Sequence, residues 1–207
     1  MIGLYGGSFD PIHIGHLRLA EDVREYYKLN KIIFIPAYLS PLKHRINILP
    51  EDRLKLIEMA IGYNPYFDID DREIKNEKVS YTINTILFYK RKLGYNPIFL
   101  VGSDAFLSLH KWRKYNLLLE ITNFIVIGRD KDNLADIYEY SRKVLCKDLR
   151  LTKTIEPFSA NIYFFNGRRI DISSSEIRDR IRRGKPITYL VPPIVEDYIK
   201  EKRLYVE

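Results

Sequence analysis

The chain has 207 residues, of which 46% are hydrophobic, and this is enough to bury the core of one α/β domain. No apolar run approaches the ~20 residues that cross a bilayer, and no basic targeting segment opens the sequence. We therefore expect a cytoplasmic protein with no membrane partner. The single cysteine, Cys146, excludes an intramolecular disulfide framework and a multi-cysteine zinc site.

The net charge of +7 raises the question of nucleic-acid binding. The basic residues are scattered, except for a cluster from Arg178 to Lys185 that alternates with acidic and apolar residues. This alternation predicts an amphipathic helix with a basic outer face, and no helix-turn-helix, zinc-finger or RNA-binding aromatic motif accompanies it. Because a basic surface also suits small polyphosphate substrates, we expect no nucleic-acid partner. The sequence leaves a homo-oligomer open.

Strand and helix patterns alternate along the chain, which predicts an α/β fold. We expect a Rossmann-like, doubly wound parallel sheet of about five to six strands with helices on both faces. Apolar runs predict five strands, over 2–5, 31–35, 67–70, 97–102 and 123–128. Helices are predicted over 17–23, 51–61, 80–93, 105–119, 134–145, 173–183 and 193–202.

The remaining signals concern turns and domain boundaries. Gly94 and Gly184 stand where glycines commonly end helices. Residues 161–165 and 169–172 are predicted as a strand pair, or hairpin, around Asn166-Gly167. No repeat, low-complexity segment or linker interrupts the chain, so a single domain is expected.

The most informative segment runs from Gly6 to His16, between the first predicted strand and the first predicted helix. Glycines at such a turn let a phosphate approach the backbone, and the N–H groups of the helix N-terminus can then bind it. His13 and His16 are three residues apart at that helix start, so both face the place where phosphates would lie. On this segment alone, capping groups or a metal pair remain alternatives for the two histidines.

Chemistry-bearing residues also follow the carboxyl ends of other predicted strands. Doubly wound sheets bind their ligands at that edge. The residues in question are Gly6 and Gly7 after the first strand, Pro36 after the second, Gly102, Ser103 and Asp104 after the fourth, and Gly128 and Arg129 after the fifth. Their convergence predicts one site along that edge.

Three serines, from Ser173 to Ser175, precede the amphipathic helix. Ser173 with Glu176 fits a capping box. The same helix N-terminus, together with the hydroxyl groups and Arg178, also suits a phosphate. On this segment alone capping is the favoured interpretation, although capping and phosphate binding can coexist.

Two of these segments resemble the signature motifs of the HxGH nucleotidyltransferase superfamily. The chain matches Gly-x-Phe-x-Pro-x-His-x-Gly-His at every fixed position from Gly7 to His16. The string from Ile172 to Arg178 is similar to Ile-Ser-Ser-Thr-x-Ile-Arg. The resemblance implies a single nucleotidyltransferase domain over residues 1–207, in which the histidines contact a nucleotide triphosphate and are not metal ligands. It is weakest from Asp130 to Phe165.

Three further segments are similar to the bacterial nicotinate mononucleotide adenylyltransferases. They are Ser80–Ile86, the Gly-x-Asp-x(4)-Leu-x-x-Trp-like stretch that begins at Gly102, and the tail from Ile187 to Tyr205. This resemblance implies adenylyl transfer from ATP to nicotinate mononucleotide, which gives nicotinate adenine dinucleotide and pyrophosphate in NAD biosynthesis. Mg²⁺ would be carried with ATP. The alternatives are a phosphopantetheine adenylyltransferase, which lacks the Ser-Tyr-Thr and tryptophan segments, and a non-catalytic nucleotide- or RNA-binding protein.

The resemblance also implies roles for individual residues. The catalytic set is His13, His16, Lys43 and Arg178. The ATP-binding set is Gly6, Gly7, Ser8, Phe9, Gly15, Gly102, Asp104, Ile172, Ser173, Ser174 and Ser175. The set for nicotinate mononucleotide is Thr85, Trp112 and Arg129, and no residue is assigned to a metal. In these roles an acidic residue at a strand end accepts hydrogen bonds from ribose hydroxyls, and an indole stacks on a pyridine ring.

One position departs from the family pattern. After the second strand the family shows Pro-Pro-His-Lys, whereas this chain has Pro41, Leu42, Lys43 and then His44. Lys43 can still bind a phosphate. A role for the missing histidine is in doubt, and His44, one residue later, is a partial substitute.

Overall fold

A computed structural model describes residues 1–41, 47–128 and 132–206. Within these residues seven strands form one sheet in the order β3-β2-β1-β4-β5-β7-β6. The strands are β1 Ile2–Gly7, β2 Lys31–Pro36, β3 Phe67–Ile69, β4 Ile98–Gly102, β5 Asn123–Gly128, β6 Leu149–Arg150 and β7 Ile162–Asn166. The order 3-2-1-4-5 is that of a doubly wound Rossmann sheet, so the predicted fold class is confirmed.

Most of the predicted helices form within a few residues of their expected bounds. The helices are α1 Ile14–Tyr26, α2 Pro50–Ile61, α3 Arg72–Lys75, α4 Thr82–Leu93, α5 Ser103–Phe106, α6 Tyr115–Ile121, α7 Asp132–Lys143, α8 Ser174–Arg182 and α9 Pro193–Glu201. Gly94 and Gly184 follow α4 and α8 with φ of 73° and 63°. This left-handed backbone favours glycine, which confirms both as helix-ending residues. Within the described residues, no helix is both long enough and apolar enough to span a membrane.

Three predictions about secondary structure are wrong. The described part of the chain forms a sheet of seven strands and not five to six, because the two-residue strand β6 is too short to show any alternation. The predicted hairpin is absent: β7 pairs in parallel with β5 and β6, and residues 169–172 form no strand. The predicted helix over 105–119 is broken into α5, a 3₁₀ turn at Leu109–Lys111 and α6. It breaks because Trp112 is extended and Lys114 takes a left-handed backbone, with φ of 55°.

Contacts divide the chain into two compact units. Unit 1 comprises Met1–Gly6, Asp22–Ile32 and Tyr81–Arg169, and unit 2 comprises Gly7–Glu21, Ile33–Ser80 and Ile170–Glu207. Each unit draws on three segments that are far apart in the sequence. The single domain over residues 1–207 stays a prediction.

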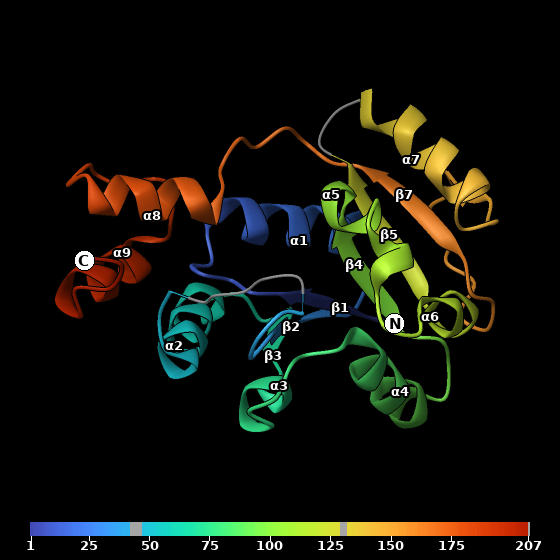
Figure 1. Cartoon of the computed structure of the whole chain (residues 1–207), viewed down its shortest axis with the longest axis horizontal. Coiled ribbons are helices and arrows are strands. Elements are labelled where there is room, and N and C mark those ends of the chain that lie inside the picture. The colour runs from blue at the N-terminus through green and yellow to red at the C-terminus, as the bar shows by residue number, and fades with distance from the viewer. Residues whose placement is uncertain (42–46, 129–131, 207) are drawn as a thin grey trace. The chain divides into compact units, whose positions relative to one another are not determined.

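Unit 1 is built on strands β4, β5 and β7, which lie side by side (Figure 1). All six residues of β5 are buried, as expected for an inner strand of a parallel sheet. In register, Phe99 of β4 pairs with Phe124 of β5, and Phe124 pairs with Ile162 of β7. The continuous apolar run predicted over 123–128 thus forms the centre of this core.

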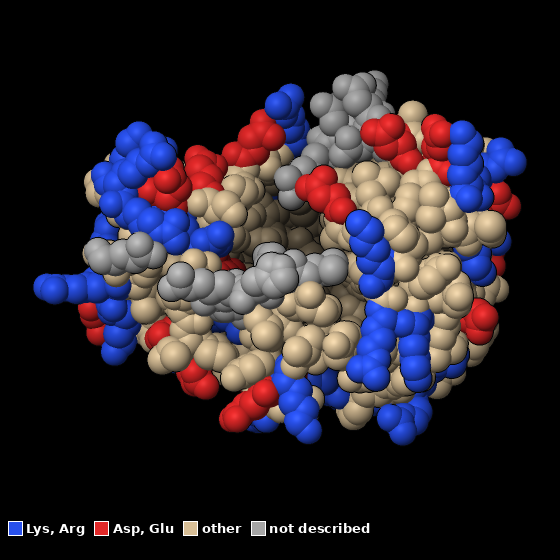
Figure 2. All heavy atoms as spheres, in the orientation of Figure 1, with Lys and Arg blue, Asp and Glu red and all other residues tan. Residues whose placement is uncertain are grey.

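Unit 2 contains the last two helices and α2. Helix α9 packs on α2, and the Tyr198 hydroxyl donates to Oδ1 of Asp52 across this contact at 3.0 Å. Helix α8 buries Ile177 and leaves Arg182 and Arg183 exposed. Figure 2 shows Lys and Arg side chains gathered over α8. The predicted basic outer face of this helix is therefore confirmed.

Candidate active site

The loop from Ser8 to His13, which we call the motif loop, links β1 to α1 in unit 2. Phe9 takes a left-handed backbone, with φ of 47°, and its side chain is buried. Its ring packs edge-on against His16 at 5.2 Å and against Phe34 at 5.6 Å between centroids. A Cβ on Gly7 would lie 2.9 Å from the Phe9 ring, so glycine is needed there for packing. The ring of Phe9 therefore supports His16 directly.

The rings of His13 and His16 stack at the start of α1. Their centroids are 3.7 Å apart and their planes differ by 30°. Nδ1 of His16 accepts a hydrogen bond from the backbone N–H of His13 at 3.3 Å, so a neutral His16 carries its proton on Nε2 and can donate from there. A Cβ on Gly15 would lie 3.0 Å from Nδ1 of His13, and glycine leaves the room that this ring occupies. The prediction that the two histidines share one face is confirmed.

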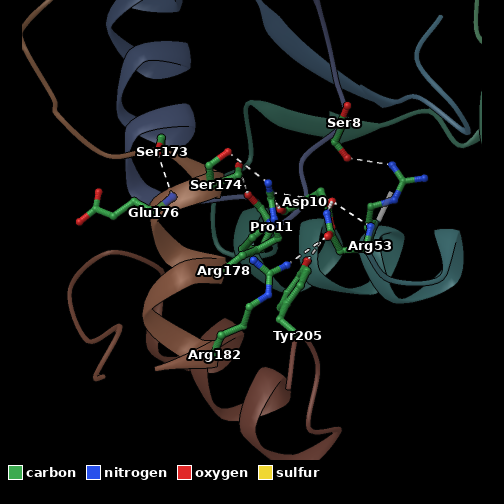
Figure 3. A network of polar contacts seen from close by, with 12 residues as sticks. Ser8, Asp10, Pro11, Arg53, Ser173, Ser174, Glu176, Arg178, Arg182 and Tyr205 are labelled. Atoms are coloured by element: carbon green, nitrogen blue, oxygen red, sulfur yellow. Dashed lines mark hydrogen bonds and ion pairs between the residues drawn. The ribbon is translucent and has the colours of Figure 1, made fainter. Parts of the chain in front are cut away.

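The serines before α8 make bonds within the protein (Figure 3). Ser173 caps the helix, since its Oγ accepts from the backbone N–H of Glu176 at 3.1 Å. The Ser174 hydroxyl donates to the carbonyl oxygen of Pro11 at 2.8 Å and ties α8 to the motif loop. The Ser175 hydroxyl accepts from Nη2 of Arg178 at 3.1 Å. The predicted N-cap is confirmed, and ATP binding by these serines stays a prediction.

Arg178 is held in place by the motif loop. Its Nη1 donates to the carbonyl oxygen of Asp10 at 2.6 Å and lies 3.9 Å from the Asp10 carboxylate. Only 18% of the side chain is exposed. A guanidinium fixed in this way presents its charge in one orientation, and this reduces the cost of binding an anion.

A buried carboxylate, Asp10, lies at the centre of this region. Its exposed fraction is 4%. Oδ2 accepts from the backbone N–H of Asn47 at 3.2 Å and from the Asn47 side chain at 2.7 Å, and Oδ1 accepts from the Tyr205 hydroxyl at 3.0 Å. Asp10 was not predicted as a site residue, because it occupies a variable position of the motif. Its partners are also remote in sequence.

Arg53 of α2 is the second buried charge that was not predicted from the sequence. It is fully buried, and it donates to the carbonyl oxygens of Ser8 at 2.8 Å, Ala37 at 2.6 Å and Tyr38 at 3.0 Å. Burial lowers the pKa of Arg53, while Asp10 and other nearby groups act to raise it. One signal could have revealed it: an arginine three and four residues before two buried apolar residues lies on the core face of a helix.

The end of strand β4 carries the predicted ribose-binding residue in unit 1. Asp104 is exposed in the first turn of α5 and makes no hydrogen bond or ion pair to any described residue. A Cβ on Gly102 would meet no atom within 4 Å, so the space beside this strand end is open. The carboxylate is thus available to accept hydrogen bonds from a ligand.

Trp112 lies between the 3₁₀ turn and α6 in unit 1. Its ring meets Phe99 edge-on at 6.3 Å between centroids, and its buried Nε1 has no hydrogen-bond partner among the described residues. The residues on either side are anchored. His110 bonds to the Tyr140 hydroxyl at 2.8 Å, and the Arg113 guanidinium stacks over Tyr81 at 4.6 Å.

Comparisons with known proteins identify the family. Residues 4–180 match the family described as cytidylyltransferase-like. A relative from a Hydrogenobaculum species, named probable nicotinate-nucleotide adenylyltransferase, is 38% identical over 206 residues, which cover 100% of this chain and 98% of the relative. A relative of the same name from Aquifex aeolicus is 38% identical over 84% of this chain and 98% of its own length. The chain belongs to the nicotinate-nucleotide adenylyltransferases of the cytidylyltransferase-like family.

A solved structure agrees with the fold. Plasmodium falciparum nicotinic acid mononucleotide adenylyltransferase complexed with NaAD superposes with a TM-score of 0.75 at 21% identity. The match covers 99% of this chain and 96% of that chain. This likeness confirms the Rossmann-like architecture.

The structure brings some of the predicted site residues together. In unit 2 the motif loop, the stacked histidines, the serines and Arg178 form one connected cluster. In unit 1 a Cβ on Gly6 would lie 2.7 Å from the ring of Phe99, so glycine is needed there for packing. The same Phe99 ring contacts Trp112 edge-on. Thr85 is buried inside α4, at 3% exposure. Lys43 and Arg129, with Leu42 and His44, lie outside the described residues.

Proposed function

We propose that this chain transfers the adenylyl group of ATP to nicotinate mononucleotide, forming nicotinate adenine dinucleotide and releasing pyrophosphate. The pair of stacked histidines at the start of α1 carries this proposal. The sequence supports the proposal as well, because the chain is 38% identical over its whole length to a relative named for this activity.

The proposed reaction needs no covalent intermediate and no general base. A phosphate oxygen of nicotinate mononucleotide is already anionic, and it forms a bond to the α-phosphorus of ATP while the bond to pyrophosphate breaks. Catalysis is then positioning and charge stabilisation. His16 donates from Nε2 to the triphosphate as charge builds there, and the stacked ring of His13 fixes its orientation. Mg²⁺ enters as part of the ATP substrate.

The remaining site residues bind and orient the two substrates. The N-terminus of α8 and the fixed charge of Arg178 hold the phosphates. Asp104 accepts hydrogen bonds from the ribose of ATP, and Trp112 stacks on the pyridine ring. The roles of Lys43, Thr85 and Arg129 rest on the family resemblance alone. A cytoplasmic location and the absence of a nucleic-acid partner stay predictions of the sequence.

Pyrophosphate release by the purified protein tests the proposal. We expect release with ATP, Mg²⁺ and nicotinate mononucleotide, its loss on chelation of the metal, and its return with excess Mg²⁺. His16→Ala, prepared in parallel, controls for a contaminating enzyme. Turnover with only 4′-phosphopantetheine, or with only CTP, would overturn the assignment.

A further inference from the structure

Asp10 joins three separate segments of unit 2 to the motif loop, two through its carboxylate and one through its backbone carbonyl oxygen (Figure 3). Asn47 comes from the chain before α2, Arg178 from α8, and Tyr205 from the segment after α9. Each of its two carboxylate oxygens has a donor, and Oδ1 receives the Tyr205 hydroxyl at 3.0 Å. The position of Asp10 therefore depends on residues that lie well outside the motif.

The motif loop transmits that position to the histidines. Ser8 is fixed by Arg53 and Asp10 by Tyr205, so both neighbours of Phe9 are anchored. This anchoring holds Phe9 in its left-handed backbone, which is unfavourable for a residue other than glycine. The Phe9 ring in turn lies edge-on against the ring of His16. A shift of Asp10 would move Phe9 and, through it, His16.

Tyr205 is suited to hold Asp10 firmly. Its side chain is 6% exposed, and its backbone is also left-handed, with φ of 66°. Burial, and then the Asp10 carboxylate, raise the pKa of the Tyr205 hydroxyl, so it remains a hydrogen-bond donor at neutral pH. The bond is thus buried, charge-assisted and directed at one carboxylate oxygen.

We propose that Tyr205 is a positioning residue of the adenylyl transfer: through Asp10 it holds the motif loop that aligns His16 with the reacting phosphate. The inference rests on the proposed function. It adds to the reaction a residue that lies far from the motif in sequence and touches neither histidine. Since misplacing a catalytic group by about 1 Å costs about 10²-fold in rate, a partial release of the loop should cost about tenfold.

The test compares two conservative substitutions in the same unit. Tyr205→Phe removes the hydroxyl that bonds to Asp10, and Tyr198→Phe removes a hydroxyl that bonds to Asp52 at the same distance of 3.0 Å. We expect Tyr205→Phe to lower kcat about tenfold while KM for ATP and for nicotinate mononucleotide changes less than about twofold. Tyr198→Phe should leave kcat unchanged. Thermal unfolding of both variants reports any loss of stability separately.

A second measurement does not depend on turnover. In Tyr205→Phe the imidazole NMR signals of His13 and His16 should shift from their wild-type positions, and in Tyr198→Phe they should not. Unchanged signals and unchanged kcat in a folded Tyr205→Phe protein would overturn the inference, as would equal losses in both variants. A wild-type protein that does not turn over ATP and nicotinate mononucleotide refutes the proposed function, and the NMR comparison then still decides whether Tyr205 positions the histidines.

Discussion

The two units hold their candidate site residues in different ways. In unit 2 the motif loop is tied by hydrogen bonds to buried polar groups, and Asp10 and Arg53 are almost inaccessible to water. In unit 1 Asp104 is exposed without a described partner, and Trp112 is supported by an aromatic contact and by its anchored neighbours. One region is fixed by buried polar bonds, and the other has an exposed carboxylate and a half-buried indole ring.

This difference agrees with the chemistry proposed for each region. A group that stabilises developing charge must be oriented before the reaction begins, and buried hydrogen bonds provide that orientation. A ring that stacks on a substrate, or a carboxylate that meets hydroxyls, needs mainly an accessible surface. We therefore expect substitutions in the motif loop of unit 2 to act on kcat. Substitutions at Asp104 and Trp112 in unit 1 should act on KM.

The largest effect is expected from His16→Ala. Loss of one preorganised donor to a developing charge typically costs about 2.7–4 kcal/mol, so kcat should fall by about 10²-fold or more. Circular dichroism and thermal unfolding should show an intact fold, because the histidine is only partly buried at a helix start. A soluble, folded variant with unaltered kcat would remove His16 from the mechanism and with it the contrast between the units.

Arg53→Met should give the next largest effect, on stability. The substitution keeps much of the side-chain volume but leaves the carbonyl oxygens of Ser8, Ala37 and Tyr38 without their donor. Buried groups left unpaired cost about 1–3 kcal/mol each, and with partial relaxation we expect a total loss of about 3 kcal/mol. Urea unfolding measures it.

A matched control separates the loss of buried hydrogen bonds from the loss of a positive charge. Arg150 pairs with Glu156 on the surface, and its side chain is 43% exposed. Arg150→Met should change the free energy of unfolding by less than about 1 kcal/mol. Equal losses in the two variants would mean that the three buried hydrogen bonds of Arg53 add nothing beyond a surface contact.

Local features of the fold could be predicted from the sequence, whereas the long-range contacts that hold them could not. Strand β5 and the cap of α8 could be predicted directly, because an apolar run and an N-cap serine are local signals. The placement of His13 and His16 on one face could be predicted for the same reason, since their spacing puts both rings at one helix start. Asp10 and Tyr205 are 195 residues apart in a bond that no periodicity reveals. The Asn166-Gly167 turn predicted a hairpin wrongly, because the parallel partner of β7 lies far away in sequence.

Alkaline pH should weaken both units through one buried tyrosine in each. Burial raises the pKa of Tyr205 in unit 2 and of Tyr27 in unit 1, where the Tyr27 hydroxyl donates to the carbonyl oxygen of Phe164 at 3.2 Å. The unfolded chain ionises these groups near their ordinary pKa of about 10, while the folded chain keeps them neutral. Their contribution to stability is therefore complete below about pH 10 and is lost as the pH rises further.

The slope of stability against pH measures this effect. The free energy of unfolding should fall by about 1.4 kcal/mol per pH unit for each tyrosine that ionises only when unfolded. Tyr205→Phe and Tyr27→Phe should each reduce the slope by about that amount. Tyr63→Phe should leave it unchanged, because the Tyr63 side chain is 89% exposed in the folded protein. A slope that neither buried variant alters would contradict the assignment.

A smaller effect concerns the choice of pyridine nucleotide in unit 1. We expect kcat/KM to favour nicotinate mononucleotide over its amide by at least about tenfold, which is about 1.4 kcal/mol. A carboxylate only accepts hydrogen bonds, so backbone N–H groups near Thr85 and Trp112 would pair with both of its oxygens. An amide nitrogen turned toward those donors would leave donors unpaired on both sides. Equal kcat/KM for the two nucleotides would defeat this expectation and indicate a dual-specificity enzyme.

Substitution at Trp112 shows whether unit 1 binds the pyridine ring at all. Trp112→Ala removes the stacking surface and should raise KM for nicotinate mononucleotide, with KM for ATP and kcat nearly unchanged, because stacking contributes about 0.5–1.5 kcal/mol beyond area burial. Trp112→Phe keeps an aromatic face and the edge contact with Phe99, so its KM should lie close to that of the wild type. An effect of Trp112→Ala confined to ATP would assign the ring to the other substrate. An effect confined to kcat would show that unit 1, like unit 2, orients the reacting groups.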